Sequence, residues 1–359
     1  MRSTTIPSVA EQSFTPAGAV AGIGSLPFDS ASAAIQAVAE SSPEIPFWPQ
    51  LPQLAPQEGL IAQGLDILGE LIERRSTGYG YDIKAGRIDQ ALDLLHRSDG
   101  RLSQRNAAGF GAFEAALASG VFASARAVKG QIEGPITLST YLFYGGKPLL
   151  SEPAFFAAVA FHVSQVACWQ ISRLGVSGLP VLLFVDEPAL CLEGPPEISL
   201  DEDQRLSALA ATLNAIRSYG AVAGLHCCAA RPFERMCAVR PNILSFDAHH
   251  GLELFFSNSD ALDYVRRGGV VAYGLIPTRR RLEDVEPVSI FSRWLKGAAL
   301  AGDPQEMARN GMITATCGLG LLDADAVEES FRLAHGVGRL FRKLSGVEEP
   351  AMAKGRSSS

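Results

Sequence analysis

The sequence predicts an α/β protein, a (β/α)8 TIM barrel with a helical insertion after its second strand. Two observations carry this prediction. Eight short apolar runs alternate with helical stretches between residues 18 and 345, which is typical of a parallel sheet that closes on itself. Glycine and polar residues then interrupt these runs at equivalent points, as expected where parallel strands converge. An open doubly wound sheet is the alternative architecture.

Each predicted strand is an apolar run of ordinary strand length. In chain order the strands are "GAVAGIG" (18–24), "EIPFW" (44–48), "ARAVKGQIEG" (125–134), "PVLLFVDE" (180–187), "GAVAGLHC" (220–227), "NILSFDA" (242–248), "GVVAYGLI" (269–276) and "MITATCG" (312–318).

The predicted helices lie between these runs, and many begin with Ser or Asp, whose side-chain oxygen can accept from the free amides of a first turn. They include "SASAAIQAVAE" (30–40), "EPAFFAAVAFHVSQVACWQISRL" (152–174), "EDQRLSALAATLNAIRSY" (202–219), "SDALDYVRRG" (259–268) and "DADAVEESFRLAHGVGRLFRKL" (323–344). The long connection 49–124 is the expected insertion, with helices near 60–75 and 87–119 and a loop or lid at "STGYGYD" (76–82). We expect an N-terminal arm (1–17), a single barrel domain (18–345) and a disordered tail (346–359).

Composition excludes several functional classes. The chain has 359 residues, 47% of them hydrophobic and 19% charged, and a net charge of −7, which disfavours a broad nucleic-acid surface. No run of 18 apolar residues predicts a membrane span, and the N-terminus lacks the apolar segment of a secretory signal. Six scattered cysteines suit reduced thiols, so we expect a cytoplasmic protein.

In a barrel the catalytic residues gather at the carboxyl ends of the strands. The stretch "GLHCCAA" (224–230) follows such a strand. Residues two apart on a strand point the same way, so His226 and Cys228 can both face the mouth while Cys227 faces away. An imidazole and a thiolate are typical zinc ligands, and Cys317, after the eighth strand, is the best-placed third one. Three ligands with one open position would make the site catalytic.

The alternative for these residues is structural: Cys227, Cys228 and Cys317 would be small buried hydrophobes and His226 a hydrogen-bonded core residue. We interpret Cys168, Cys191 and Cys237 as structural residues whether or not the other cysteines bind a metal.

Two other strand ends carry carboxylates. In "VDEPAL" only one of Asp186 and Glu187 should enter the mouth, to bind a substrate ammonium group or to act as a general acid or base. The alternative is helix capping. Asp247, close to His249 and His250, is a further candidate metal ligand or supporting carboxylate, although exposed loop polarity explains the two histidines as well.

Two loops complete the candidate site. "GIGSLP", with Ser25, is a glycine-rich turn whose amides could hold a carboxylate, or simply a tight turn. "PTRRR" (277–281) could attract an anion, but a solvated loop explains it better.

The motifs "GIGSLP", "IPFWPQLP", "VKGQIEGPIT", "FVDEPAL", "LHCC", "ILSFDA", "YGLIPT" and "TCGLG" occur in an order and spacing that resembles the catalytic half of cobalamin-independent methionine synthase. The resemblance extends to the shorter members of the uroporphyrinogen decarboxylase and methionine synthase superfamily and covers residues 18–345. It implies a TIM barrel, and in the methyltransferase branch a zinc ion that activates a thiol to attack an electrophilic methyl group.

Carried over residue by residue, His226, Cys228 and Cys317 match the zinc ligands of that branch. Asp186 matches the acid that binds the amino group of homocysteine, and Ser25 matches a serine near its carboxylate. Asp247 lies close to where those synthases carry a glutamate as a further ligand, and it is one methylene shorter.

The chain also departs from that family. We expect no counterpart of the second, N-terminal barrel that helps to hold folate in that family. The sequence also has no match to the His-Gly-Glu stretch that carries the family's second amino-group carboxylate. The methyl donor is therefore open between a methyl-folate and a methyl-corrinoid, the latter brought by a carrier protein as partner.

Three functional hypotheses follow. The leading one is a zinc-dependent methyltransferase that acts on a thiol, homocysteine giving methionine. A porphyrin-precursor decarboxylase on the same fold would need an arginine-rich mouth, and residues 3–73 contain no Lys or Arg. The third is a non-catalytic zinc- or corrinoid-binding accessory protein.

Overall fold

The fold is built on a six-stranded, all-parallel sheet. The computed structural model describes residues 14–192, 201–278, 282 and 285–347. Its central sheet has the order β10-β9-β8-β7-β6-β3, and all neighbouring strands pair in parallel. The strands are β3 (Val128–Glu133), β6 (Val181–Asp186), β7 (Val222–Cys227), β8 (Ile243–Phe246), β9 (Val270–Ile276) and β10 (Gly311–Ala315). These six confirm the last six predicted strands, with ends that differ by a few residues.

The first two predicted strands contribute isolated bridges instead of full ladders. Val20 bridges Ile313 of β10, and Phe47 bridges Lys129 of β3, both in parallel. The two segments meet each other where Ser25 bridges Gln50. Prolines at positions 43, 46 and 49 remove amide donors from the second segment, which explains its short pairing. The hydrogen bonds thus run from β10 through both segments to β3, compatible with a TIM-like barrel.

Two separate apolar clusters lie on the two sides of this curled sheet. The larger one fills the layer between the strands and the helices outside them. The smaller one takes side chains from segments all round the sheet, namely Ala19, Ala21, Ile45, Ala127, Leu182, Phe184, Ile243, Ala272 and Met312. A sheet that curls round its own inner side chains buries a cluster of this kind.

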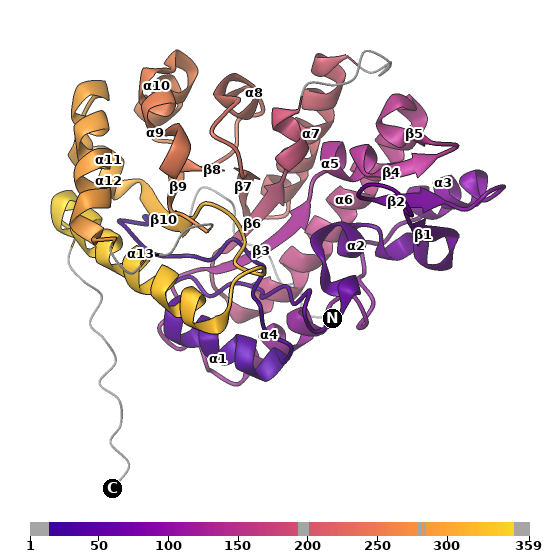
Figure 1. The fold of residues 1–359 in the computed structure, drawn as a ribbon, viewed down its shortest axis with the longest axis horizontal. Helices are drawn as coiled ribbons and strands as arrows, with labels where there is room; N and C mark the ends of the chain where they lie inside the picture. The colour runs from indigo at the N-terminus through magenta and orange to yellow at the C-terminus, as the bar shows by residue number, and fades with distance from the viewer. Residues whose placement is uncertain (1–13, 193–200, 279–281, 283–284, 348–359) are drawn as a thin grey trace, which may run out of the picture.

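Helices follow the strands and cover the outer face of the sheet (Figure 1). They are α1 (Ala31–Ser41), α6 (Pro153–Leu174), α7 (Glu202–Ser218), α8 (Phe233–Ala238), α9 (Ala248–Ser257), α10 (Ser259–Arg266), α11 (Pro287–Ala301), α12 (Pro304–Arg309) and α13 (Ala324–Ser345). Two predicted caps are confirmed, since Ser30 and Asp323 accept from amides in the first turns of α1 and α13. Asp201 caps α7 in the same way.

The insertion mixes helices with a second sheet. It contains η2 (Pro56–Glu58), α2 (Leu60–Gly64), η3 (Asp66–Leu71), β1 (Ile72–Arg74), β2 (Tyr81–Ile83), α3 (Ile88–His96) and α4 (Ala108–Ala118). The hairpin β1–β2 pairs with β4 (Leu142–Tyr144), which pairs with β5 (Lys147–Pro148), at one end of the molecule (Figure 1). The prediction of a helix to residue 75 is wrong at its end, and "STGYGYD" is the turn of this hairpin, where Gly78 and Gly80 take positive φ values.

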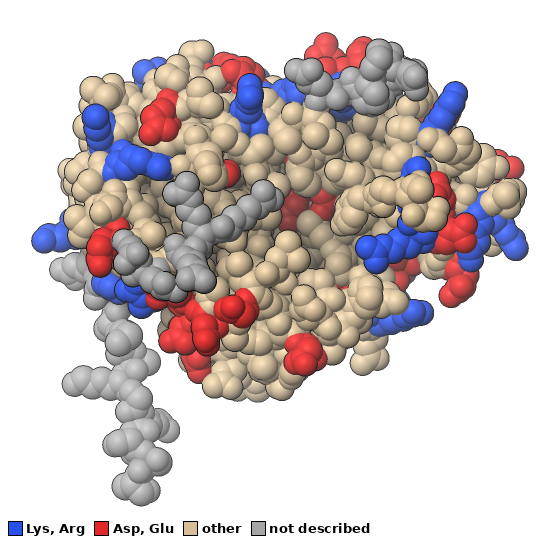
Figure 2. Space-filling model, in the orientation of Figure 1, with Lys and Arg blue, Asp and Glu red and all other residues tan. Residues whose placement is uncertain are grey.

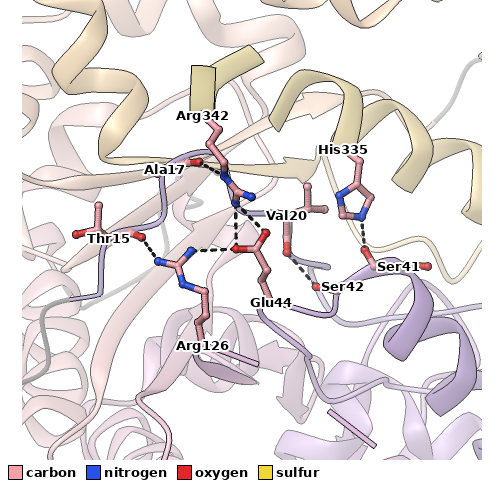
Figure 3. A network of polar contacts seen from close by, with 9 residues as sticks. All are labelled: Thr15, Ala17, Val20, Ser41, Ser42, Glu44, Arg126, His335 and Arg342. Atoms are coloured by element: carbon pink, nitrogen blue, oxygen red, sulfur yellow. Dashed lines mark hydrogen bonds and ion pairs between the residues drawn. The ribbon is translucent and has the colours of Figure 1, made fainter. Parts of the chain in front are cut away.

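A polar network ties the start of the described chain to its end (Figure 3). The Glu44 carboxylate accepts from Arg126, just before β3, at 2.9 Å and from Arg342 of α13 at 2.8 Å. Arg126 also donates to the Thr15 carbonyl at 2.7 Å, and Arg342 donates to the Ala17 carbonyl at 3.3 Å. The network therefore fastens both bridging segments at the amino ends of the strands.

One described helix, Pro153–Ser177, is long and apolar enough to span a membrane by length and composition alone. However, 61% of its apolar window is buried inside the protein, where α6 packs against α3, α7, β3 and α5 (Pro135–Thr140). This burial identifies α6 as a core helix of the fold.

Several predicted features fall on residues that the structure does not describe. Residues 1–13 of the expected arm, residues 348–359 of the expected tail and residues 279–281 of "PTRRR" lie outside the described part.

Candidate functional site

Four polar residues form a row across neighbouring strands of the main sheet. Glu133 of β3 pairs with Asp186 of β6, Asp186 with His226 of β7, and His226 with Ser245 of β8. Paired residues of parallel strands point to the same side of a sheet. All four are buried, at the carboxyl ends of strands that are otherwise apolar. The register therefore places two carboxylates, an imidazole and a hydroxyl side by side.

His226 is held by one ring nitrogen, and its other ring nitrogen has no partner. Nδ1 lies 2.9 Å from the Ser245 hydroxyl. Nε2 is buried and makes no hydrogen bond. A buried nitrogen without a partner is costly unless a ligand completes it, and orientation of an imidazole through its second nitrogen is typical of metal-binding histidines.

Two cysteines lie beside this histidine. Cys228 follows the end of β7, two residues after His226, and Cys317 follows β10. The Cys317 thiol interacts with Cys228 and with His226. These contacts, that of Cys228 first, lower the pKa of Cys317 to about 4 against the effect of burial, and the same pairing raises the pKa of Cys228. The two thiols therefore titrate as a coupled pair, and their contact favours loss of one proton from the pair.

The neighbouring Cys227 lies on the other side of the strand, as the two-residue period predicts. It is fully buried in the cluster between strands and helices, beside Cys191. Interaction with Cys191, and burial, raise the pKa of the Cys227 thiol. Cys168 of α6 and Cys237 of α8 lie elsewhere in the fold.

The donor set of His226, Cys228 and Cys317 fits zinc chemically. One imidazole nitrogen and two sulfurs are typical zinc donors, and the unpartnered Nε2 is an atom that a bound ion would satisfy. Within the residues described, however, no group of three or more His, Cys, Asp and Glu side chains stands ready-made around a metal position. The chemistry of these three residues is therefore compatible with the predicted zinc site. The described residues are not, however, arranged in a coordination geometry.

The two acids of "VDEPAL" have different surroundings. Burial raises the pKa of Asp186 to about 6, against the effects of His226 and Lys129, and its Oδ1 has no partner. The Glu187 carboxylate instead accepts from the Ile136 amide at 2.8 Å, the Thr137 amide at 2.9 Å and the Thr137 hydroxyl at 2.6 Å. Glu187 therefore caps the N-terminus of α5. This arrangement favours the helix-capping alternative for Glu187. Its expected role in substrate binding stays a prediction.

Asp247 also serves a helix. Its carboxylate caps α9 by accepting from the His250 amide at 3.0 Å, and it lies 2.7 Å from His250 Nδ1. Both oxygens are thus engaged within α9. These contacts make Asp247 a helix cap, as its place at the N-cap explains. Its candidate role as a further metal ligand stays a prediction.

Ser25 lies next to the loop that carries Cys317. Its carbonyl accepts from the Leu319 amide at 2.8 Å. A Cβ added to Gly318 would stand 3.1 Å from the Ser25 Cβ, so glycine permits this close approach. The turn "GIGSLP" and the loop "TCGLG" are therefore packed together, as expected for neighbours at one mouth.

Strand β3 supplies three polar side chains to the inside of the sheet, none of which was a predicted site residue: Lys129, Gln131 and Glu133. Lys129 donates to the Ile23 carbonyl at 2.6 Å and to Gln131 at 2.9 Å, and burial lowers its pKa to about 8. Glu133 is 1% exposed, and neither of its carboxylate oxygens has a partner. The alternation of Lys, Gln and Glu in "VKGQIE" was the signal available for this polar face.

Two tyrosines flank the row. The rings of Tyr79 and Tyr141 meet edge to face at 5.1 Å. Burial raises the pKa of both phenols, and the nearby Glu133 carboxylate adds to this effect. Tyr141 also interacts with Cys228, so it lies close to the cysteines.

On the face seen in Figure 2, acidic side chains lie in a central hollow, while most Lys and Arg side chains lie toward the edge.

Comparisons with known proteins give a fold and no family. No family model matches the chain, and no curated protein matches it. A B12-independent methionine synthase from Shewanella sp. W3-18-1, solved in complex with selenomethionine, is similar with a TM-score of 0.45 and 15% identity, over 76% of this chain and 74% of that one. A methyltransferase from Methanosarcina mazei has a TM-score of 0.51 and 12% identity, over 90% and 94% of the two chains. The second match indicates a shared fold.

Proposed function

We propose that this protein is a zinc-dependent methyltransferase that transfers a methyl group to a thiol, homocysteine being the acceptor and methionine the product. One observation carries the proposal: the unpartnered Nε2 of His226 lies beside the Cys228 and Cys317 sulfurs, next to the buried carboxylate of Asp186. The residues that could hold a thiol-binding metal ion therefore lie next to Asp186, the carboxylate that could bind a substrate ammonium group. The methyltransferase from Methanosarcina mazei, with which the chain shares its fold, is consistent with this assignment.

In this proposal His226, Cys228 and Cys317 hold the zinc ion. When bound, zinc lowers the pKa of a substrate thiol and makes that thiol nucleophilic at neutral pH. Ser245 fixes the orientation of the His226 ring through the 2.9 Å contact at Nδ1. The Asp247 carboxylate caps α9, and the proposal does not need it as a further ligand.

Asp186 binds and orients the ammonium group of the amino acid. Its buried position strengthens an ion pair, since little water screens the two charges. Ser25 lies beside the Cys317 loop and would hold the carboxylate end of the substrate. The contribution of these two residues is to position the thiol against the methyl donor.

The proposal includes a complete (β/α)8 barrel, in which residues 18–24 and 44–48 are the first two strands. The bridges at Val20, Phe47 and Ser25 support this closure, and so do the side chains that both segments add to the inner cluster. The insertion at 49–124 then follows the second strand.

We assign the methyl donor to a methyl-corrinoid or a methyl-folate, the former delivered by a carrier protein. A porphyrin-precursor decarboxylase is disfavoured, because Glu133 and Asp186 would repel a substrate with many carboxylates. An accessory protein without activity would bind zinc but show neither heat nor proton release with homocysteine.

The experiment is methyl transfer from methylcobalamin or methyl-folate to homocysteine by purified zinc-loaded protein, with methionine measured by mass spectrometry. Cys227 and Cys228 provide a matched pair of variants, since Cys227, the last residue of β7, contacts Cys191 in the outer layer, while Cys228 after it contacts Cys317. Cys228→Ala should abolish turnover, whereas Cys227→Ala should keep it at reduced stability. Absence of methionine with both donors, or equal activity of the two variants, would refute the proposal.

A further inference from the structure

Glu133 and Asp186 leave three buried carboxylate oxygens without hydrogen-bond partners: both oxygens of Glu133 and Oδ1 of Asp186. The two residues are register partners on the adjacent strands β3 and β6, so the three oxygens belong to one place. Buried carboxylates without partners are costly, and each ordinarily has a donor or a cation beside it.

The groups around Glu133 do not supply that partner. The groups whose charges act on it are acids or a thiol, namely Asp186, Glu187 and Cys317. The phenols of Tyr79 and Tyr141 also lie near Glu133, but neither makes a hydrogen bond to its carboxylate. The Thr137 hydroxyl lies nearby, but its proton is donated to Glu187 at 2.6 Å. The Lys129 ammonium is engaged with the Ile23 carbonyl and Gln131, four residues earlier on the same strand. Burial and the neighbouring acids raise the pKa of Glu133 well above its usual value.

We propose that Glu133 is a second carboxylate for the ammonium group of the thiol substrate and closes on it together with Asp186. A primary ammonium carries three N–H donors, which equals the number of oxygens that lack a partner here. The inference rests on the proposed function and deepens it, because it makes the primary amine a requirement for the acceptor thiol. Glu133 is a specificity-determining residue in this account, and it takes no part in the bond changes.

The test removes one partner of the predicted ion pair at a time: the amine from the ligand, or the Glu133 carboxylate from the protein. Homocysteine and 4-mercaptobutanoate share the thiol and the carboxylate and differ in the amine. Isothermal titration of zinc-loaded wild type and Glu133→Gln with both ligands gives four dissociation constants. Glu133→Gln should weaken homocysteine binding by about tenfold to a hundredfold, as for the loss of a charged hydrogen bond, and should change 4-mercaptobutanoate binding by no more than about twofold.

Equal weakening of both ligands, or no change for either, would overturn the inference. Zinc content is measured on each sample, and loss of zinc in Glu133→Gln alone would also overturn it, since Glu133 would then act on the metal. Glu133→Asp keeps the charge and should restore part of the preference for the amine; it serves in place of Glu133→Gln should the latter fail to fold.

A ligand without a thiol separates this inference from the proposed function. 2-Aminobutanoate carries the amine and carboxylate but cannot bind through sulfur. If wild type binds it and Glu133→Gln does not, the ammonium site stands even where methyl transfer fails. If wild type binds neither 2-aminobutanoate nor homocysteine, the ammonium site is refuted.

Discussion

Replacement of Glu187 by alanine should cost much of the stability of this fold, while replacement of its neighbour Asp186 by asparagine should not. The Glu187 carboxylate accepts three hydrogen bonds from Ile136 and Thr137 at 2.6 to 2.9 Å, and it is fully buried. Each buried donor left without an acceptor costs about 1–3 kcal/mol, and water can reach part of the space left by the side chain. We therefore expect Glu187→Ala to lower the free energy of unfolding by about 3 kcal/mol or more.

The assay is urea unfolding followed by far-UV circular dichroism, with wild type, Glu187→Ala and Asp186→Asn compared at pH 7.5. Asp186 Oδ1 has no hydrogen bond to lose, so Asp186→Asn should stay within about 1 kcal/mol of wild type while binding homocysteine weakly. A cost below about 1 kcal/mol for Glu187→Ala, or a larger cost for Asp186→Asn, would refute the division of the two acids into a helix cap and a substrate anchor.

Two further perturbations probe the fold away from the site. Burial lowers the pKa of His162 to about 4, so the unfolded chain binds a proton between pH 6.5 and 4 that the folded chain does not, and stability falls as the pH falls through this range. The stability difference between wild type and His162→Gln, measured by urea unfolding at pH 7.5 and 4.5, should therefore shrink by about 2 kcal/mol at the lower pH; a constant difference contradicts this reasoning. Glu44→Gln should lower the free energy of unfolding by about 2 kcal/mol, because Arg126 and Arg342 lose a shared, partly buried carboxylate. Its chemical denaturation curve checks this, and a loss below about 0.5 kcal/mol would contradict the role of Glu44 in fastening the chain ends.

The parallel strands could be predicted because each is a buried apolar run that ends in a glycine or polar residue. Six of the eight predicted runs are strands of the main sheet, and they follow one another across the sheet in chain order. The pairing of the first two predicted runs, 18–24 and 44–48, was harder to predict, because proline and glycine interrupt their hydrogen-bond ladders and leave single bridges. The hairpin 72–83 was missed because its two strands are three residues long and complete their sheet only by pairing with β4, about 60 residues away.

The candidate site could be predicted in part from the two-residue period of strands. That period separates Cys227 from Cys228 and Asp186 from Glu187, and the structure places each pair on opposite sides. The period does not say which acid points inward. That choice depends on α5, whose free amides lie close to Glu187 only in the folded chain.

Glu133 was missed for a related reason. Its unusual state comes from its pairing with Asp186, 53 positions later, and no local feature of "VKGQIE" reports that neighbour. The role of Asp247 likewise depended on whether its helix begins at the next residue, and α9 does begin at Ala248.

The central claim is that His226, Cys228 and Cys317 together bind one zinc ion. The most direct measurement is the zinc content of purified wild type, Cys317→Ala and Cys227→Ala by inductively coupled plasma mass spectrometry, on samples whose folding is verified by circular dichroism. The account predicts about one zinc per chain in wild type and in Cys227→Ala, and almost none in Cys317→Ala. A folded wild type that takes up no zinc, or a Cys317→Ala variant that keeps its full content, would contradict it.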